Sequence, residues 1–154
     1  MNKLIKKIMI ALDFSDYTEP SVEYGIALAR QLEATLLLVN VVNNRDLMAV
    51  EKYLAISEPD LYQKFVDDTY AARHDSLHKL LSKAAAQGVD GQKLVKTGVP
   101  YSELLSAIES EKPDLLIMGT KGRSNLTDAI IGSCAQKMYR RSPIPLLSIR
   151  PPQK

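Results

Sequence analysis

Hydrophobic residues in this chain follow two patterns: short unbroken runs, and longer stretches in which apolar residues recur every three or four positions. Unbroken runs bounded by turn residues are typical of buried strands, whereas the longer spacing is typical of helices with one buried face. The runs predict strands at 5–12, 35–42, 92–97, 114–118 and 146–149. The spacing, with its glycine and proline boundaries, predicts helices at 61–86 and 133–141, two that begin at residues 18 and 100, and a short one at 47–54.

The alternation of strands and helices predicts an α/β fold, with one open sheet of five parallel strands and helices on both faces, Rossmann-like in outline. At 154 residues, the chain is most simply one domain over residues 1–154. The strand at 92–97 is shorter and more polar than the others, so we expect it near an edge of the sheet. Ligands of such sheets bind beyond the carboxyl ends of the strands, where the strand order switches.

Local signals indicate where two of the helices begin and how the first one packs. Thr18 is the expected N-cap of the first helix, and Gly25 is expected to permit close approach to the sheet. Ser133 and Gln136 have the spacing of a capping box, which predicts that the Ser133 hydroxyl caps its own helix. The expected buried stripe of the first helix is Val22, Ile26, Ala29 and Leu32.

Composition excludes several classes of function. The net charge is +2, with 20 basic and 18 acidic residues, so nothing global indicates a nucleic acid or an anionic membrane as partner. The apolar run at 8–12 that follows the basic start is too short for a secretory signal or a membrane span. We therefore expect a cytoplasmic protein, and the single cysteine excludes an internal disulfide.

The segment after the fourth predicted strand has the most specific pattern in the chain. Gly119, Gly122 and the pair Gly132-Ser133 are spaced as glycine, two residues, glycine, nine residues, glycine, serine. Glycines allow tight turns and close ligand approach, and the N-terminus of the following helix attracts anions. A phosphate cradle is therefore predicted, with Lys121 and Arg123 adding positive charge; ordinary turn punctuation is the alternative.

Two other residues are expected at the same edge of the sheet. Asp13 follows the first strand, where a carboxylate accepts hydrogen bonds from a ribose diol or, alternatively, caps the turn after it. Val41 ends the second strand and suits a flat contact with adenine, although packing alone also explains a valine there. Both alternatives stay open on sequence grounds.

Other motifs lack support. No dinucleotide glycine motif or P-loop occurs, and His74 with His78 has no third metal ligand in view, so a solvated helix face is favoured. Cys134 is most simply a small buried residue. Lys137 is expected, with the arginines that follow it, to complement the dipole at the end of its helix.

The chain resembles the universal stress protein family over essentially its whole length. The resemblance rests on the opening strand with Asp13 at its end, on residues 114–119, on the glycine pattern and on the closing residues 142–150. In this family, the glycine pattern separates members that bind ATP from those that do not. The segment 43–59 has no strong family signature, and we expect it to carry what is specific to this member.

The resemblance implies a fold of the adenine nucleotide alpha hydrolase-like kind, a homodimer paired along the last strand, and a role in the stress response. By position, Asp13 would contact the ribose and Val41 the adenine. The residues implied around the phosphates are Gly119, Gly122, Arg123, Gly132, Ser133 and Cys134.

The leading hypothesis is an ATP-binding regulator whose nucleotide changes its conformation or its affinity for a partner. AMP or ADP are the other candidate ligands, and Mg²⁺ is the expected companion of ATP. A rival is a slow ATPase or phosphoryl-transfer enzyme, but the group that would orient the nucleophile is not evident in the sequence. A third hypothesis is a nucleotide-free dimeric interaction module.

Overall fold

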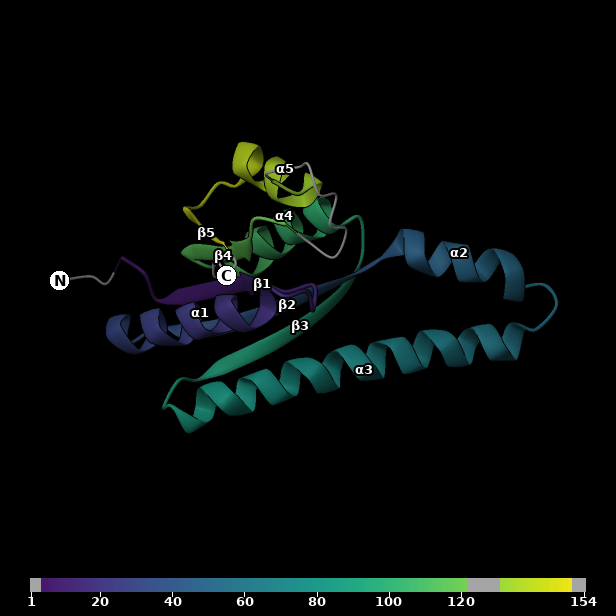
Figure 1. Ribbon diagram of the computed structural model, residues 1–154, viewed down its shortest axis with the longest axis horizontal. Helices are drawn as coiled ribbons and strands as arrows, with labels where there is room; N and C mark the ends of the chain where they lie inside the picture. Colours follow the sequence, from purple (N-terminus) through teal and green to yellow (C-terminus); the bar gives the residue numbers. More distant parts are fainter. Residues whose placement is uncertain (1–3, 122–130, 151–154) are drawn as a thin grey trace.

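A computed structural model describes residues 4–121 and 131–150 of the chain. Five parallel strands form one sheet in the order β3-β2-β1-β4-β5, with helices on both faces (Figure 1). The predicted fold class is confirmed, and the polar strand β3 lies at an edge of the sheet, as expected. No helix among the described residues is long and apolar enough to cross a membrane.

The predicted elements all occur, with small shifts at their ends. The strands are β1 Lys7–Ala11, β2 Thr35–Asn43, β3 Gly91–Gly98, β4 Leu115–Gly119 and β5 Leu146–Ile149. The helices are α1 Thr18–Leu32, α2 Asn44–Leu54, α3 Pro59–Ala86, α4 Pro100–Glu111 and α5 Ser133–Arg141.

The two faces of the sheet carry separate hydrophobic clusters because successive side chains of a strand point to opposite faces. Ile8 and Ile10 of β1 pack with residues of α1 and α3, whereas Met9 between them packs with residues of α4 and α5. Figure 1 shows these helix pairs on opposite sides of the sheet. Burial on both faces explains why the central strands have unbroken apolar runs in the sequence.

Helix α1 packs closely on the sheet, but its N-cap and the extent of its buried stripe differ from the prediction. A Cβ built at Gly25 would lie 2.2 Å from Ile10 Cδ1, so glycine is required for this close approach. Leu32 is 37% exposed, so the buried stripe ends at Ala29. Thr18 is the first helical residue, and the N-cap position belongs to Tyr17 without a side-chain hydrogen bond. The predicted Thr18 cap is therefore wrong by one residue.

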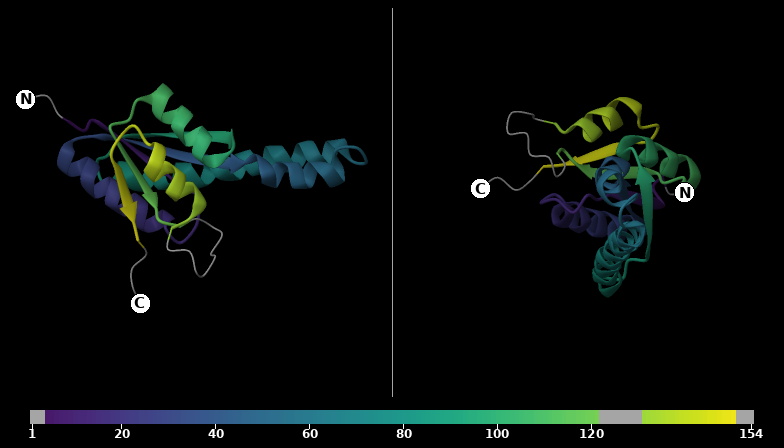
Figure 2. Two further views of the ribbon diagram at one scale, coloured as in Figure 1. Left: turned by 90° about the horizontal axis from the view of Figure 1, so that it is seen from above. Right: turned by 90° about the vertical axis from the view of Figure 1, so that its right-hand side faces the viewer.

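Helices α2 and α3 form a hairpin whose outer half projects well beyond the sheet (Figure 2). Asn43 caps α2, accepting a hydrogen bond from the Arg45 amide at 3.0 Å, and the helix is longer than the predicted 47–54. Near the tip, Tyr53 is 77% and Ile56 96% exposed. The base of the hairpin, by contrast, lies against the carboxyl edge of the sheet, because α2 starts directly after β2.

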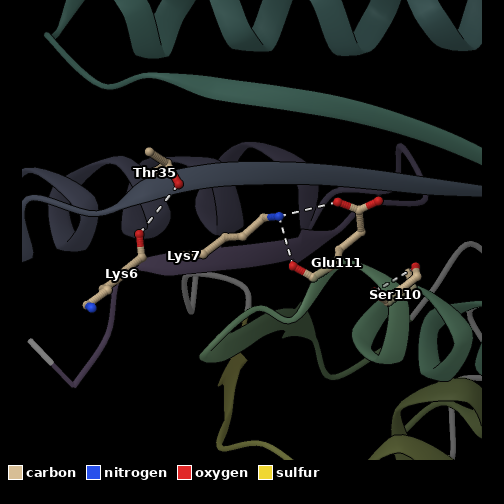
Figure 3. Close-up of polar contacts among 6 residues, drawn as sticks. Lys6, Lys7, Thr35, Ser110 and Glu111 are labelled. Atoms are coloured by element: carbon tan, nitrogen blue, oxygen red, sulfur yellow. Dashed lines mark hydrogen bonds and ion pairs between the residues drawn. The ribbon is translucent and has the colours of Figure 1, made fainter.

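At the amino-terminal edge of the sheet, polar groups pair with one another. Lys7 Nζ donates to the main-chain oxygen of Glu111 at 2.9 Å and lies 3.3 Å from its carboxylate (Figure 3). The Asp114 carboxylate accepts hydrogen bonds from the amides of Lys6 and Lys7, at 2.8 and 3.0 Å. These contacts fasten β1 to the end of α4 and to the start of β4.

Candidate functional site

A cavity of about 580 Å³ opens at the carboxyl edge of the sheet. Strand β1 has β2 on one side and β4 on the other, so the strand order switches here, where parallel sheets bind ligands. Gly122 and Arg123 lie outside the described residues. The other predicted site residues all line this one cavity: Asp13, Val41, Gly119, Gly132, Ser133 and Cys134.

Asp13 caps the turn after β1 and also lines the cavity. The Ser15 amide donates to Asp13 Oδ1 at 3.1 Å, and the Tyr17 amide donates to Ser15 Oγ at 3.3 Å. Phe14 between them has a φ of 60°, in the left-handed region. The turn-capping alternative therefore holds, and it leaves acceptor sites on the carboxylate for a ligand because an ionised carboxylate offers about four.

Gly119 is required for a different reason from the one the sequence suggested. It is the last residue of β4, and a Cβ built on it would lie 2.6 Å from Cβ and Cγ of Tyr17. The missing side chain thus makes room for the Tyr17 ring. Since Tyr17 is buried and lines the cavity, Gly119 shapes the wall through this contact.

Helix α5 begins differently from the predicted capping box. Its N-cap is Gly132, without a side-chain hydrogen bond, and the amide of Gln136 donates to the Gly132 carbonyl at 2.9 Å. Ser133 is therefore the first helical residue, and the capping box is wrong by one position. Its hydroxyl is exposed and not engaged in capping its own helix.

Some main-chain amides around the glycine segment already donate hydrogen bonds within the protein. Gly132 donates its N–H to the Thr120 carbonyl at 2.7 Å, and Thr120 donates to the Ile149 carbonyl at 3.0 Å. These bonds hold the start of α5 against the end of β4. The donors that helix geometry leaves unpaired are those of the first turn, at Ser133, Cys134 and Ala135, and all three residues line the cavity. The positive end of the α5 dipole faces the same space.

Cys134 is partly buried beside Asp13. Burial and, to a smaller extent, the negative charge of Asp13 raise the pKa of its thiol, and Lys137 lowers it; together they move the pKa from an ordinary value of 9.0 to about 11. The thiol is therefore protonated at neutral pH, as expected for an inert residue that packs.

The main chain of Val41 lies past the end of the pairing between β1 and β2. That ladder ends at the pair Ala11–Val39, followed by one bond from the Leu12 amide to the Val39 carbonyl at 2.8 Å. N–H and C=O groups of alternate residues point to the same side of a strand, so those of Val41 face the β1 side like those of Val39. Val41 is half-buried and lines the cavity.

Three buried side-chain oxygens in the cavity wall have no hydrogen-bond partner among the described residues. They are Thr18 Oγ1 and Ser21 Oγ of α1 and Asn40 Oδ1 of β2. Their residues are 8%, 1% and 1% exposed, respectively. Buried polar atoms are nearly always satisfied, so this part of the structure is unusual in leaving three of them unpaired.

Several charged residues of the cavity were not anticipated as site residues. Arg45 and Asp46 come from the start of α2 and Arg73 from α3, where it lies over the Phe14 ring at 5.4 Å. Lys137 was predicted to complement the dipole at the end of its helix, but it lies in the middle of α5. Its Nζ lies over the Tyr101 ring of α4, 4.4 Å from the ring centroid. The lysine and the tyrosine both line the cavity. They come from different helices, so the local sequence around either residue does not predict this contact.

No group of three or more His, Cys, Asp or Glu side chains with metal-binding geometry occurs in residues 4–121 and 131–150. His74 and His78 lie on α3, and the carbonyl of His74 accepts a hydrogen bond from Lys93 Nζ at 3.3 Å. Among the residues that the structure describes, the carboxylates lining the cavity are those of Asp13 and Asp46.

The sequence pattern of the universal stress protein family matches residues 4–150. The chain belongs to this family. Among its relatives, universal stress protein MJ0531 of Methanocaldococcus jannaschii is 26% identical over 98% of this chain and 85% of its own length. A universal stress protein of Thermus aquaticus is 30% identical over 96% of this chain and all of its own length.

Solved structures share the fold of this universal stress protein. Hypothetical protein MJ0577 of M. jannaschii superposes with a TM-score of 0.82 at 20% identity, covering 98% of this chain and 99% of that one. A universal stress protein in complex with cAMP gives 0.67 at 20% identity, covering 95% and 97%. One from Archaeoglobus fulgidus in complex with dAMP gives 0.66 at 14% identity, covering 95% and 98%.

Proposed function

We propose that this universal stress protein binds an adenine nucleotide, ATP in the first place, in the cavity at the carboxyl edge of its sheet. One observation carries the proposal: residues chosen from separate regions of the sequence line the same cavity. Two solved relatives are complexes with the adenine nucleotides cAMP and dAMP. AMP and ADP share the adenine and ribose and are the alternative ligands.

The first turn of α5 is the proposed phosphate site. The amides of Ser133, Cys134 and Ala135 are the unpaired donors of a helix N-terminus, a recurrent anion-binding arrangement. The free Ser133 hydroxyl adds a donor, and Lys121 at the cavity compensates phosphate charge. Gly122 and Arg123 complete this site in the proposal. Gly119 shapes its wall through Tyr17, and Gly132 holds the start of α5 through its bond to the Thr120 carbonyl.

The adenine is proposed to lie against Val41 and the ribose against Asp13. Adenine presents an acceptor, N1, beside a donor, the 6-amino group, on its Watson–Crick edge. The N–H and C=O of Val41 have the complementary order, and both face the side of β2 that β1 no longer covers. Guanine presents the reverse order of donor and acceptor, so this arrangement favours adenine.

Mg²⁺ is proposed to accompany ATP. This ion is usually held by phosphate oxygens and water with one or two carboxylates. Asp13 lines the same cavity as Ser133 and Cys134 of the proposed phosphate site, so its carboxylate is the proposed protein ligand of the ion. The bound ion would neutralise phosphate charge that the lysines at the cavity leave uncompensated.

The proposed role is regulatory: a cytoplasmic stress-response protein whose bound nucleotide changes its conformation or its affinity for a partner. The base of the α2–α3 hairpin supports such coupling, since Arg45 and Arg73 line the same cavity while the hairpin reaches far into solvent. A homodimer through β5 also belongs to the proposal. Strand β5 is an edge strand, and its outer main-chain groups are available for pairing with a second copy.

Thermal melting with and without nucleotide tests the proposal. A ligand at one hundred times its Kd adds about 2.7 kcal/mol. For a chain of this size, that corresponds to a rise in Tm of about 5–10 °C with ATP and Mg²⁺. An unchanged Tm with ATP, ADP and AMP would instead favour the nucleotide-free interaction module. A rise accompanied by steady multi-turnover phosphate release would favour the slow ATPase.

A further inference from the structure

The main-chain hydrogen bonds between strands β1 and β2 end at Leu12, although the register of the two strands would allow one more bond. The Leu12 amide donates to the Val39 carbonyl at 2.8 Å, outside the paired strand residues. In a parallel ladder, the next bond would run from the Val41 amide to the Leu12 carbonyl. Here the Leu12 carbonyl accepts from the side chain of Asn40 instead, through Nδ2 at 2.8 Å.

Asn40 is an unusual residue for its position. It is 1% exposed in a strand whose neighbouring residues are apolar, and burying an amide there is costly unless it is hydrogen-bonded. Only its Nδ2 is satisfied by the described residues; its Oδ1 is buried and has no partner among them, and the residue as a whole belongs to the lining of the cavity. The bond to Leu12 identifies the nitrogen, since a carbonyl accepts only from a donor.

We propose that Asn40 is a positioning residue for adenine recognition: by occupying the Leu12 carbonyl, it keeps the main chain of Val41 open to the base. This inference rests on the proposed function and deepens it. The amide side chain acts as a substitute for the Val41 N–H in the ladder. Val41 then retains both a donor and an acceptor for the Watson–Crick edge of adenine, although it lies only two residues past the last strand pair.

Removal of the side-chain donor should close this opening. In Asn40→Leu, the Leu12 carbonyl is left without its partner, which is costly for a buried acceptor, and the Val41 amide is the nearest main-chain donor in ladder register. The ladder is then extended by one bond at the expense of base recognition. Asn40→His is the conservative variant, because a ring nitrogen stands the same number of bonds from Cα as Nδ2 and can donate.

Two measurements on the intact chain test the proposal. The first is amide hydrogen exchange by NMR without ligand: in the wild type, Val41 should exchange at least about a hundredfold faster than Val39, and Asn40→Leu should remove most of this difference. The second is calorimetric titration with ATP, GTP and inorganic tripolyphosphate. Asn40→Leu should weaken ATP binding about tenfold while tripolyphosphate binding stays within about twofold.

Control variants separate positioning from stability. Asn40→His should keep the preference for ATP over GTP. Ser148→Ala removes another buried oxygen that has no partner among the described residues, but on β5 and outside the cavity lining, and should leave all three titrations unchanged. If Asn40→Leu does not fold, the exchange rates of Val41 and Val39 in the wild type still decide.

The outcomes distinguish this inference from the proposed function. A wild type that binds none of the adenine nucleotides overturns both. A wild type that binds ATP, with a Val41 amide as protected as that of Val39 before ligand is added, overturns the role of Asn40 alone. So does an Asn40→Leu variant whose preference for ATP over GTP is unchanged.

Discussion

The amino-terminal edge of the sheet pairs its polar groups with one another, whereas the carboxyl edge leaves several of them without partners. At the first, Lys7 engages Glu111, and the Asp114 carboxylate accepts two main-chain amides. At the second, oxygens of Thr18, Ser21 and Asn40 are buried in a cavity wall and lack partners among the described residues.

In the proposed function, the difference separates groups that stabilise the fold from groups beside the nucleotide site. A satisfied polar network contributes to stability, whereas an unsatisfied buried group costs free energy and persists only where something else requires it. Substitutions at the amino-terminal edge should therefore change the free energy of unfolding and leave nucleotide binding intact. Substitutions at the carboxyl edge should do the reverse, except where a residue also supports packing.

The largest effect is expected for Gly119→Val, because Gly119 both lines the cavity and packs against Tyr17. A Cβ at this position overlaps Tyr17, which must move and take the loop after β1 with it. ATP binding should be lost, and overpacking should destabilise the protein by about 1–3 kcal/mol. Urea unfolding and ATP titration measure the two effects. ATP affinity equal to that of the wild type would show that the Tyr17 wall does not belong to the site.

Alkylation of Cys134 should be slow at neutral pH. With a thiol pKa near 11 instead of 9.0, the thiolate fraction at pH 8 is about a hundredfold smaller than that of an ordinary thiol. Iodoacetamide rates between pH 7 and 11 measure this, and Asp13→Asn should raise the rate by removing a negative charge. A rate that levels off near pH 9 in the wild type would contradict the electrostatic picture.

The same pKa shift has a defined sign for stability. A thiol whose pKa is raised in the folded protein contributes stability that is fully present below the unfolded value of 9.0. That contribution is lost as the pH rises from 9.0 toward about 11. Denaturant unfolding of the wild type and Cys134→Ser across this range should show a smaller decline for the variant.

Asp114→Ala should destabilise the amino-terminal edge without affecting the cavity. The substitution removes the acceptor of the Lys6 and Lys7 amides. A loss of about 2 kcal/mol is expected, since hydrogen bonds to charged groups contribute about 1.5–3 kcal/mol. Urea unfolding measures the loss. A fall in ATP affinity in this variant would show that the two edges are not independent.

The smallest effect is expected for Ser133→Ala. The hydroxyl does not cap α5, so the free energy of unfolding should change by less than about 0.5 kcal/mol, compared with about 1 kcal/mol for the loss of a capping residue. ATP affinity should fall about threefold through the loss of one hydroxyl donor to phosphate. If the variant has a lower free energy of unfolding but an unchanged affinity for ATP, Ser133 caps α5 and the predicted capping box is correct.

The strands and their parallel direction could be predicted from the sequence, because strands buried on both faces have unbroken apolar runs. The order of the strands in the sheet was not predicted. The N-caps predicted for α1 and α5 were each wrong by one residue. Ser and Thr mark the region of a helix start, but Thr18 and Ser133 are the first helical residues and not the residues before them, so the hydroxyl pattern does not identify the N-cap. That one position decides whether the Ser133 hydroxyl is free.

Much of the candidate site was also accessible, because a glycine pattern and a strand-end carboxylate are local features. Arg45 and Arg73 were not, since they reach the cavity only through the α2–α3 hairpin. Asn40 lies within an apolar run of the sequence, and its role depends on where the pairing of β1 and β2 stops. How far two strands stay paired depends on the tertiary structure and cannot be predicted from the local sequence of either strand.

Hydrogen–deuterium exchange with and without ATP tests the central claim most directly, because it reports both edges in one experiment. We predict that ATP slows exchange in residues 11–17, 39–46 and 131–137, which contribute the cavity wall. Residues 4–8 and 111–115, at the amino-terminal edge, should be unchanged. Protection confined to the amino-terminal edge, or none at saturating ATP, would contradict the account.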